Sequence, residues 1–420
     1  MMLDYKFNNL LDKSGKFIGL NLKYLLKNGS WITIRFFVMA LSGWLVSLFF
    51  ARVSNKEILG QYQLILSFLS IFVVFSLPGL NQAAIESVVK GRERGVIRAV
   101  KLSFLFSLIV VPIFCGWGIF DIFYRNEILI GKTLITVGFL APFYYAFNTW
   151  TSYYDGKSLF KEVSFRMIVI NVFLSILLIS GILLKFNAFG LIAIYLLVNI
   201  VFFILFYIEV YQKIENKTSD SIDVKFGIET SIQKLILGLS GNVPPIIIAY
   251  LFGIEPVAIY YIANYLIVAA SAFMGTMTYL YIPTLFKNLK LNHKNIILQN
   301  FAVGIFLWIC FIIFLKFLFI IMYGTDYNES LQLAYKISFV IILVPFKNYL
   351  ITFFMTQKRN WLLINTVGIA NLIAVLVLFL LRNQGHLTSV SYYIYAIEIL
   401  TSIPLFASYY CNAFKKINNK

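Results

Sequence analysis

Long apolar stretches separated by short polar segments dominate the chain, and this pattern predicts a helical membrane protein. About a dozen stretches reach the roughly 20 residues that an α-helix needs to cross a hydrocarbon core of about 30 Å. Because lipid cannot satisfy exposed backbone polar groups, each span should be an α-helix. The predicted spans begin near Trp31, Tyr62, Ala99, Leu129, Phe165, Ala188, Leu235, Val257, Ile296, Leu331, Trp361 and Leu387.

The composition supports this interpretation and gives an orientation. The 420 residues are 60% hydrophobic, 18% aromatic and only 13% charged, which is too apolar for a water-soluble protein. Assigning the loops alternately to two sides places about 25 Lys and Arg on the side of both termini and about 6 on the other. We therefore expect both termini in the cytoplasm. The net charge of +17 then reflects topology and contact with anionic lipid rather than nucleic-acid binding.

Three polar segments lie outside the predicted spans. Residues 1–30 carry five Lys interleaved with apolar residues, which is typical of an amphipathic helix on the inner leaflet. Residues 211–234 are polar and mixed in charge, and they form the natural linker between two groups of spans. Residues 412–420 form a cytoplasmic tail.

A short internal repeat predicts two related bundles. The stretches "ARVSNKEILGQY" (51–62) and "AYLFGIEPVAIY" (249–260) superimpose Ala51 on Ala249, Glu57 on Glu255 and Tyr62 on Tyr260. Six spans separate the copies, so both halves have the same orientation in the membrane. We therefore predict an all-α polytopic membrane protein of about 12 transmembrane helices. Its six-helix bundles, residues 31–210 and 235–411, should be related by a pseudo-twofold axis along the membrane normal, around a central cavity.

The second span ends in an interruption, "FSLPGLNQAAIESVVKGRERG" (75–95). Pro78 removes a backbone donor and Gly79 loosens the helix, leaving polar backbone that must be buried in protein or line a wet cavity. Asn81 and Gln82 are either amides that face that cavity or ordinary capping residues. The basic cluster from Lys90 to Arg98 either attracts an anionic headgroup or forms a positive-inside loop.

Cations within the predicted spans are stronger candidates for substrate-binding residues than the amides Asn81 and Gln82. Arg35, Lys316, Lys336 and Lys347 would each cost about 2.5 to 3.5 kcal/mol at mid-bilayer, so we expect them to bind substrate rather than to face lipid. Arg35 and Lys336 lie near the ends of their spans and could also snorkel to an interface. Lys347 lies deeper, two residues after Pro345, and is the strongest candidate.

Two further charged residues complete the predicted site. Glu398 is a carboxylate near the middle of a span, and it forms either an ion pair with an intramembrane Lys or a coupling site for a proton or sodium ion. Lys234 precedes "SGNVPP", where Pro244 and Pro245 interrupt a helix, and its ammonium should face the inner cavity.

Catalytic and metal-binding patterns are absent from the sequence. There is no Gly-rich phosphate loop, no GxSxG elbow and no pair of carboxylates at one membrane depth. The three Cys and two His stand apart, without metal-ligand spacing. We therefore expect no catalytic residues, no metal site and no cofactor.

Two stretches resemble a known family. "ARVSNKEILGQYQLILSFLSIFVVFSLPGLNQAAIESVVKGRERG" (51–95) resembles the first-repeat signature of the polysaccharide transporters, the O-antigen and capsule flippases of the multidrug/oligosaccharidyl-lipid/polysaccharide exporter superfamily. "YYDGKSLFKEVSFRMIVINV" (153–172) is similar to that family's inner loop between spans four and five. The second copy has Ala258 where the first has Gly60, so only the first carries the full pattern.

The resemblance implies a flippase of the bacterial inner membrane. It would move an undecaprenyl-pyrophosphate-linked oligosaccharide, a precursor of O-antigen or capsular polysaccharide, from the cytoplasmic to the outer leaflet by alternating access. The implied partners are this lipid-linked oligosaccharide, membrane lipids, a polysaccharide polymerase and a chain-length regulator, with a functional monomer.

Three alternatives remain at this point. A multidrug exporter of the same superfamily should favour intramembrane carboxylates, whereas cations are in excess here. A membrane-embedded polysaccharide polymerase should have a sizeable outer loop with catalytic residues, which this chain lacks. A structural membrane protein would have little use for deep cations.

Overall fold

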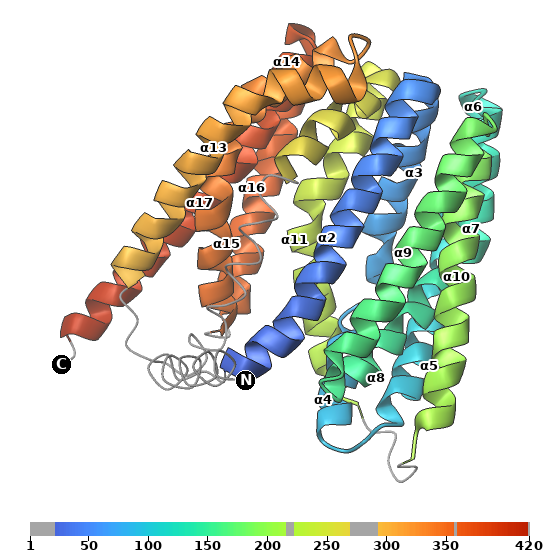
Figure 1. Cartoon of the computed structure of the whole chain (residues 1–420), viewed down its shortest axis with the longest axis vertical. Helices are drawn as coiled ribbons and strands as arrows, with labels where there is room; N and C mark the ends of the chain where they lie inside the picture. The colour runs from blue at the N-terminus through green and yellow to red at the C-terminus, as the bar shows by residue number, and fades with distance from the viewer. Residues whose placement is uncertain (1–21, 216–221, 269–292, 357–358, 419–420) are drawn as a thin grey trace, which may run out of the picture. The chain divides into compact units, whose positions relative to one another are not determined.

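A computed structural model describes residues 22–215, 222–268, 293–356 and 359–418, and every regular element within these ranges is helical (Figure 1). The predicted all-α polytopic fold class is thereby confirmed. The labelled helices are α2 (Leu22–Val53), α3 (Lys56–Phe72), η1 (Val73–Ser76), α4 (Leu80–Val89), α5 (Gly95–Ser107), α6 (Val110–Tyr124), α7 (Ile128–Phe147), η2 (Asn148–Trp150), α8 (Thr151–Gly156), α9 (Phe160–Leu183), α10 (Ala188–Lys213), α11 (Val224–Phe252), α13 (His293–Tyr323), α14 (Asn328–Ile337), α15 (Val340–Thr356), α16 (Asn360–Leu380), η3 (Arg382–Gln384) and α17 (His386–Asn418).

Ten helical segments of the described residues are long and apolar enough to span a membrane. An eleventh is present if α14 and α15, which meet at a bend of 53°, form one span. The predicted eighth span begins in the apolar helix Glu255–Val268, and the rest of it lies outside the described residues. The total of twelve and the pseudo-twofold axis stay predictions.

The chain divides into two compact units, Ile34–Ala258 and Ile259–Lys420 together with Met1–Thr33. Helix α11 begins within the predicted linker and contains the predicted start of the second bundle at residue 235, yet its contacts place it in the unit Ile34–Ala258. Helix α10 continues to Lys213 and α11 begins at Val224, so both helices extend into the polar segment between residues 211 and 234. The bounds of the two bundles stay a prediction, because helix contacts do not decide which repeat a helix belongs to.

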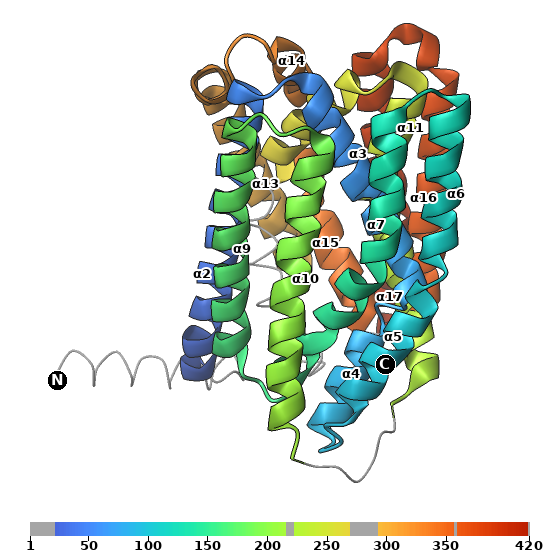
Figure 2. The same ribbon diagram turned by 90° about the vertical axis from the view of Figure 1, so that its right-hand side faces the viewer.

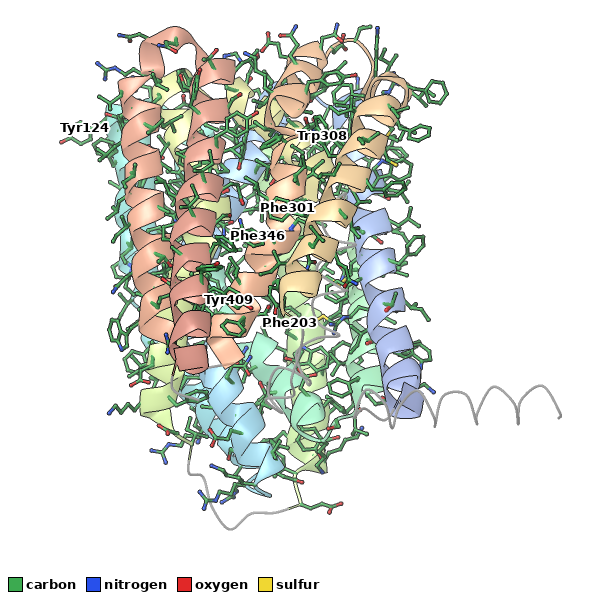
Figure 3. All side chains as sticks on the ribbon, turned by 90° about the vertical axis from the view of Figure 1, so that its left-hand side faces the viewer. Tyr124, Phe203, Phe301, Trp308, Phe346 and Tyr409 are labelled. Carbon is green, nitrogen blue, oxygen red and sulfur yellow. The ribbon has the colours of Figure 1, made fainter. Side chains whose placement is uncertain are left out.

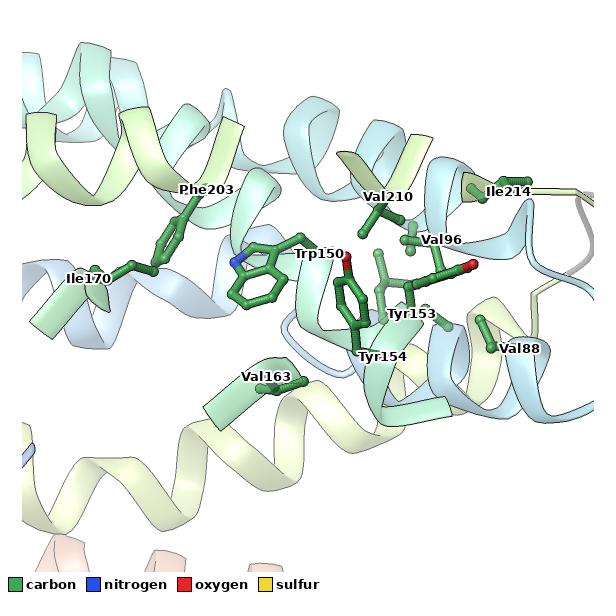
Figure 4. Close-up of a cluster of buried hydrophobic side chains, with 13 residues drawn as sticks. Val88, Val96, Trp150, Tyr153, Tyr154, Val163, Ile170, Phe203, Val210 and Ile214 are labelled. Carbon is green, nitrogen blue, oxygen red and sulfur yellow. The ribbon is translucent and has the colours of Figure 1, made fainter. Parts of the chain in front are cut away.

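Aromatic side chains form the core of the unit Ile34–Ala258 (Figure 4). Trp150, Tyr153 and Tyr154, from η2 and α8, are at most 3% exposed. Apolar residues of α4, α5, α9 and α10 surround them, including Val163 and Phe203. Figure 2 shows α9 and α10 running side by side along this unit. Burial of such large rings fixes these helices relative to one another.

Charged residues join the turns at one end of the same unit. Lys157, in the turn between α8 and α9, pairs with Glu93 in the α4–α5 turn at 2.7 Å. The backbone N–H of Glu215, after α10, donates to Glu93 at 3.1 Å. Although burial lowers the pKa of the Lys157 ammonium, its bonds to Glu93 and Tyr153 outweigh this effect and raise that pKa above its ordinary value. Three loops that the sequence places in the cytoplasm therefore lie together.

The unit Ile259–Lys420 is held by a second aromatic cluster. The ring centroids of Phe301 and Phe346 lie 5.0 Å apart, and those of Phe353 and Tyr409 lie 4.8 Å apart. Figure 3 labels Phe301, Phe346 and Tyr409, which come from α13, α15 and α17.

The predicted amphipathic segment covers residues 1–30. Residues 1–21 of this segment lie outside the described residues, and helix α2 begins at Leu22.

Candidate functional site

A break in the second span creates the candidate site. Helix α3 tightens into η1, which ends at Ser76, and Leu77 then adopts the left-handed conformation with φ of 54°. Pro78 has no backbone N–H and cannot donate the next helical hydrogen bond. Helix α4 begins again at Leu80. The Pro-Gly sequence therefore leaves backbone N–H and C=O groups between α3 and α4 without helical hydrogen-bond partners.

Helix α11 satisfies these groups. The backbone N–H of Gly79 donates to Ser231 Oγ at 2.8 Å, and Lys234 Nζ donates to the carbonyl oxygen of Pro78 at 3.1 Å. The approach is close, since a Cβ at Gly79 would lie 2.0 Å from the carbonyl oxygen of Gly227. Glycine is required at position 79 for this contact.

A cavity of about 280 Å³ lies beside the break, within the unit Ile34–Ala258. Helices α3, α4, α5, α7 and α10 contribute to its wall. Eight of its twelve lining residues carry a hydroxyl or an amide, and none is Asp, Glu, Lys, Arg or His. The lining residues are Leu66, Leu69, Ser70, Val73, Ser76, Pro78, Asn81, Ser103, Tyr144, Tyr145, Asn148 and Tyr195.

Hydrogen bonds hold some of these polar groups in place. Asn81 Oδ1 accepts a bond from Thr149 Oγ1 at 2.8 Å. The hydroxyl oxygens of Tyr144 and Tyr195 lie 3.0 Å apart, and Tyr145 donates to the carbonyl oxygen of Leu69 at 2.5 Å. The cavity wall is therefore partly preorganised.

Not every predicted residue lies at this cavity. Asn81 lines it and Lys234 contacts its edge at Pro78, whereas Gln82 is exposed and outside the lining. Arg35 lies with its guanidinium 5.3 Å from the ring centroid of Phe36 and interacts electrostatically with Asp155.

The other unit contains a buried ion pair. Lys347 Nζ on α15 lies 2.5 Å from Glu398 Oε1 on α17, and the two side chains are 16% and 10% exposed. The structure thus brings together two residues that the sequence singled out separately. Glu398 Oε2 is buried and has no hydrogen-bond partner among the described residues. Such a pair is costly to break from one side, because the remaining charge stays buried.

The two remaining predicted cations lie on the surface. Lys316 is exposed on α13, as are Phe314 and Phe317. Lys336 is exposed in the last turn of α14, next to the bend, and its carbonyl oxygen accepts a bond from the hydroxyl of Tyr395. Over the same described ranges, no group of three or more His, Cys, Asp or Glu side chains lies close enough together to hold a metal ion.

The aromatic and polar wall of the cavity was not predicted. Tyr144 and Tyr195 lie in α7 and α10, which are apolar around most of their circumference, so no amphipathic stripe marks their inner face. Tyrosine is also abundant, with 26 in the chain, so the sequence does not show which tyrosines line the cavity. The polar residues within apolar spans were the only available signal.

Comparison with known proteins supports the family resemblance. Residues 25–289 match the family described as "Polysaccharide biosynthesis protein". No curated protein matches the chain in sequence.

Three solved structures share the fold at 12% identity. The lipid II flippase MurJ, in an inward closed conformation, superimposes with a TM-score of 0.67 over 90% of this chain and 86% of that chain. An outward-facing multidrug resistance MATE family transporter of the MOP superfamily has a TM-score of 0.65 over 94% of this chain and 95% of that chain. A MOP superfamily transporter from Pyrococcus furiosus, described as having a binding pocket of reverse polarity, has a TM-score of 0.60 with the same coverage.

These neighbours are transporters and a flippase rather than enzymes, which agrees with the expectation of a non-catalytic chain. The family match covers more than half of the 420 residues. The chain therefore belongs to the polysaccharide biosynthesis protein family and has the fold of MOP-superfamily transporters.

Proposed function

We propose that this protein is a flippase for a lipid-linked oligosaccharide. It moves an undecaprenyl-pyrophosphate-linked repeat unit, a precursor of O-antigen or capsular polysaccharide, from the cytoplasmic to the outer leaflet of the bacterial inner membrane. The polysaccharide biosynthesis family and the flippase among its structural neighbours support this assignment. Both termini then face the cytoplasm, and the two bundles alternate in access.

The observation that carries the proposal is the ammonium of Lys234 at the edge of an uncharged polar cavity. Lys234 uses one of its three donor hydrogens on the carbonyl of Pro78, which itself lines the cavity. The remaining donors can bind a phosphate oxygen. A diphosphate must be neutralised and hydrogen-bonded as it leaves water, and a lysine held at a helix break meets this need.

The other intramembrane cations extend this role. In our proposal Arg35, Lys316 and Lys336 bind the diphosphate or anionic headgroups at other stages of the cycle, while Asn81 and Gln82 offer amide contacts. Lys347 either joins the substrate site when it leaves Glu398 or locks α15 to α17. Glu398, once released, would be free to bind a proton or a sodium ion, which links ion binding to substrate binding.

A cationic drug would find little in the cavity to bind it. None of its twelve lining residues carries a carboxylate, and the ammonium of Lys234 is bonded to Pro78, which lines it. A cation would therefore meet repulsion rather than compensation. This electrostatic difference favours an anionic lipid-linked substrate over the drugs that a MATE-type exporter handles.

The test is transport by the purified protein in liposomes. A polyprenyl-pyrophosphate oligosaccharide is placed in one leaflet and its arrival in the other is followed, with a cationic dye as competing substrate. Movement of the lipid-linked sugar, unaffected by dye, is the expected result. Movement of dye alone would replace the proposal with drug export.

We also propose that the protein functions as a monomer and that it works with a polysaccharide polymerase and a chain-length regulator. Reconstituting these components together would test both proposals.

A further inference from the structure

We infer that the cavity of the unit Ile34–Ala258 is a binding site for a single uncharged sugar ring. The inference rests on the proposed function and deepens it, because it assigns the sugar that follows the diphosphate to a defined set of residues. The diphosphate then contacts Lys234 while the first sugar occupies the cavity on the other side of Pro78.

Unused hydrogen-bonding capacity is the first argument. The hydroxyl of Ser103 and the amide of Asn148 line the cavity and can both donate and accept hydrogen bonds. The oxygen of Asn81 accepts a bond from Thr149, which leaves its NH₂ group as a donor among the described residues. Because Tyr144 and Tyr195 bond only to each other, one hydroxyl hydrogen of the pair is also available. Polar groups at membrane depth need partners, so the cavity requires a polar occupant.

The mixture of donors and acceptors is the second argument. Hydroxyl and amide groups can both give and receive hydrogen bonds, as can every hydroxyl of a sugar. The tyrosine rings of the wall add apolar faces against which the C–H groups of a pyranose can pack. None of the lining residues carries a charge that would neutralise an anion, and a cation would be held only by neutral oxygens.

The size of the cavity is the third argument. At about 280 Å³ the cavity is just below the roughly 300 to 1,000 Å³ of pockets that hold drug-sized ligands, so it suits one pyranose ring rather than a whole oligosaccharide. The rest of the glycan would therefore lie outside the cavity.

Binding of simple sugars to the full-length protein in nanodiscs tests this inference. Methyl glycosides of a hexose, an N-acetylhexosamine and a 6-deoxyhexose are titrated by ligand-detected NMR, and at least one should bind. Ser103→Ala and Tyr195→Phe should each weaken that binding by about three- to tenfold, the expected loss for one hydrogen bond. Neither should change the binding of inorganic pyrophosphate, which Lys234→Ala should weaken.

Ser107→Ala is the matched control. Ser107 lies one turn from Ser103 on α5, is buried, and donates to the carbonyl oxygen of Phe104 without lining the cavity. Sugar binding should be unchanged in this variant. A thermal unfolding scan of each variant establishes that the fold is retained.

The remaining outcomes separate the two proposals. Liposomal flipping that proceeds without glycoside binding, and is indifferent to Ser103→Ala and Tyr195→Phe, would overturn the sugar site and leave the flippase. Glycoside binding through these residues by a protein that moves no lipid-linked sugar would overturn the flippase and leave the site. Stabilisation by NaCl but not by choline chloride, lost in Ser103→Ala and without any glycoside effect, would assign the cavity to an ion instead.

Discussion

Lys347 and Glu398 are 51 positions apart in the chain, yet their charged atoms lie 2.5 Å from each other in the interior of the unit Ile259–Lys420. The pair joins α15 to α17, and Lys347 lies about two turns along α15 from its bend with α14. One carboxylate oxygen of Glu398 is left without a partner among the described residues. This combination of a strong bond and an unsatisfied atom makes the pair sensitive to the loss of either charge.

Removing one member of this pair should destabilise the protein far more than removing both. Lys347→Met leaves a buried carboxylate unpaired, and we expect a loss of about 3 to 5 kcal/mol in the free energy of unfolding. The double variant Lys347→Met/Glu398→Leu should recover most of that loss, because no buried charge remains. Unfolding in detergent with increasing denaturant measures both values.

The same variants separate a structural pair from a coupling site. If Glu398 binds the coupling ion, Glu398→Gln should transport without dependence on a proton or sodium gradient. If the pair is structural, Glu398→Gln should keep any ion dependence and differ only in stability. Recovery of stability without recovery of transport in the double variant would place the pair in the transport cycle.

Lys234 should be needed for transport more than for folding. Lys234→Ala removes the ammonium at Pro78 and should lower the flipping rate at least tenfold, since a charge-assisted bond to phosphate is worth about 1.5 to 3 kcal/mol. Lys234→Arg keeps the charge and should retain part of the rate. Lys132→Ala serves as the control, because Lys132 is an exposed cation of α7 outside the cavity lining. Equal rates for Lys234→Ala and Lys132→Ala would remove Lys234 from the site.

The sequence predicted the elements of the fold well, because each depends on local composition. Apolar length alone located the spans. The Pro78-Gly79 pair marked the break before α4, whereas Pro244 and Pro245, which were also expected to interrupt a helix, lie inside the continuous helix α11.

The site could be predicted only in part. Residue type identified Lys347 and Glu398, but their pairing depends on the packing of α15 against α17, which no local pattern encodes. Tyr144 and Tyr195 come from α7 and α10 and meet only in the folded unit. Gln82 and Lys316 are exposed in the structure, and the sequence cannot tell which face of a helix is exposed. Their role in binding stays a prediction.

The close contact at the helix break gives a prediction about stability. Gly79→Ala would place a Cβ 2.0 Å from the carbonyl oxygen of Gly227, so α4 and α11 must separate. We expect a loss of about 1 to 3 kcal/mol, as for other overpacked sites, together with impaired transport. Gly116→Ala on α6 is the control, since no atom lies within 4 Å of the added Cβ. It should be neutral or slightly stabilising. A Gly79→Ala variant as stable as Gly116→Ala would mean that α11 does not pack closely on the break.

Arg166 should stabilise the unit Ile34–Ala258 through geometry rather than charge alone. Its guanidinium donates to both carboxylate oxygens of Glu209, at 2.7 and 3.2 Å, and pairs with Glu162 at 2.5 Å. It also lies 4.6 Å from the ring centroid of Tyr154, so it joins α9 to α10 and to the aromatic core.

Arg166→Lys keeps the charge but cannot form the bidentate bond or stack its plane on the ring. We expect this variant to lose about 1 to 3 kcal/mol in the free energy of unfolding. Lys213→Ala provides the matched control, because Lys213 pairs with the same Glu209 at 2.6 Å but is 48% exposed, and such a pair contributes at most about 1 kcal/mol. Denaturant unfolding of both variants shows whether the bidentate geometry of the guanidinium or only its positive charge stabilises the protein. If Arg166→Lys is as stable as the unaltered protein while Lys213→Ala is not, net charge around Glu209 holds the helices together, and the fork of the guanidinium is dispensable.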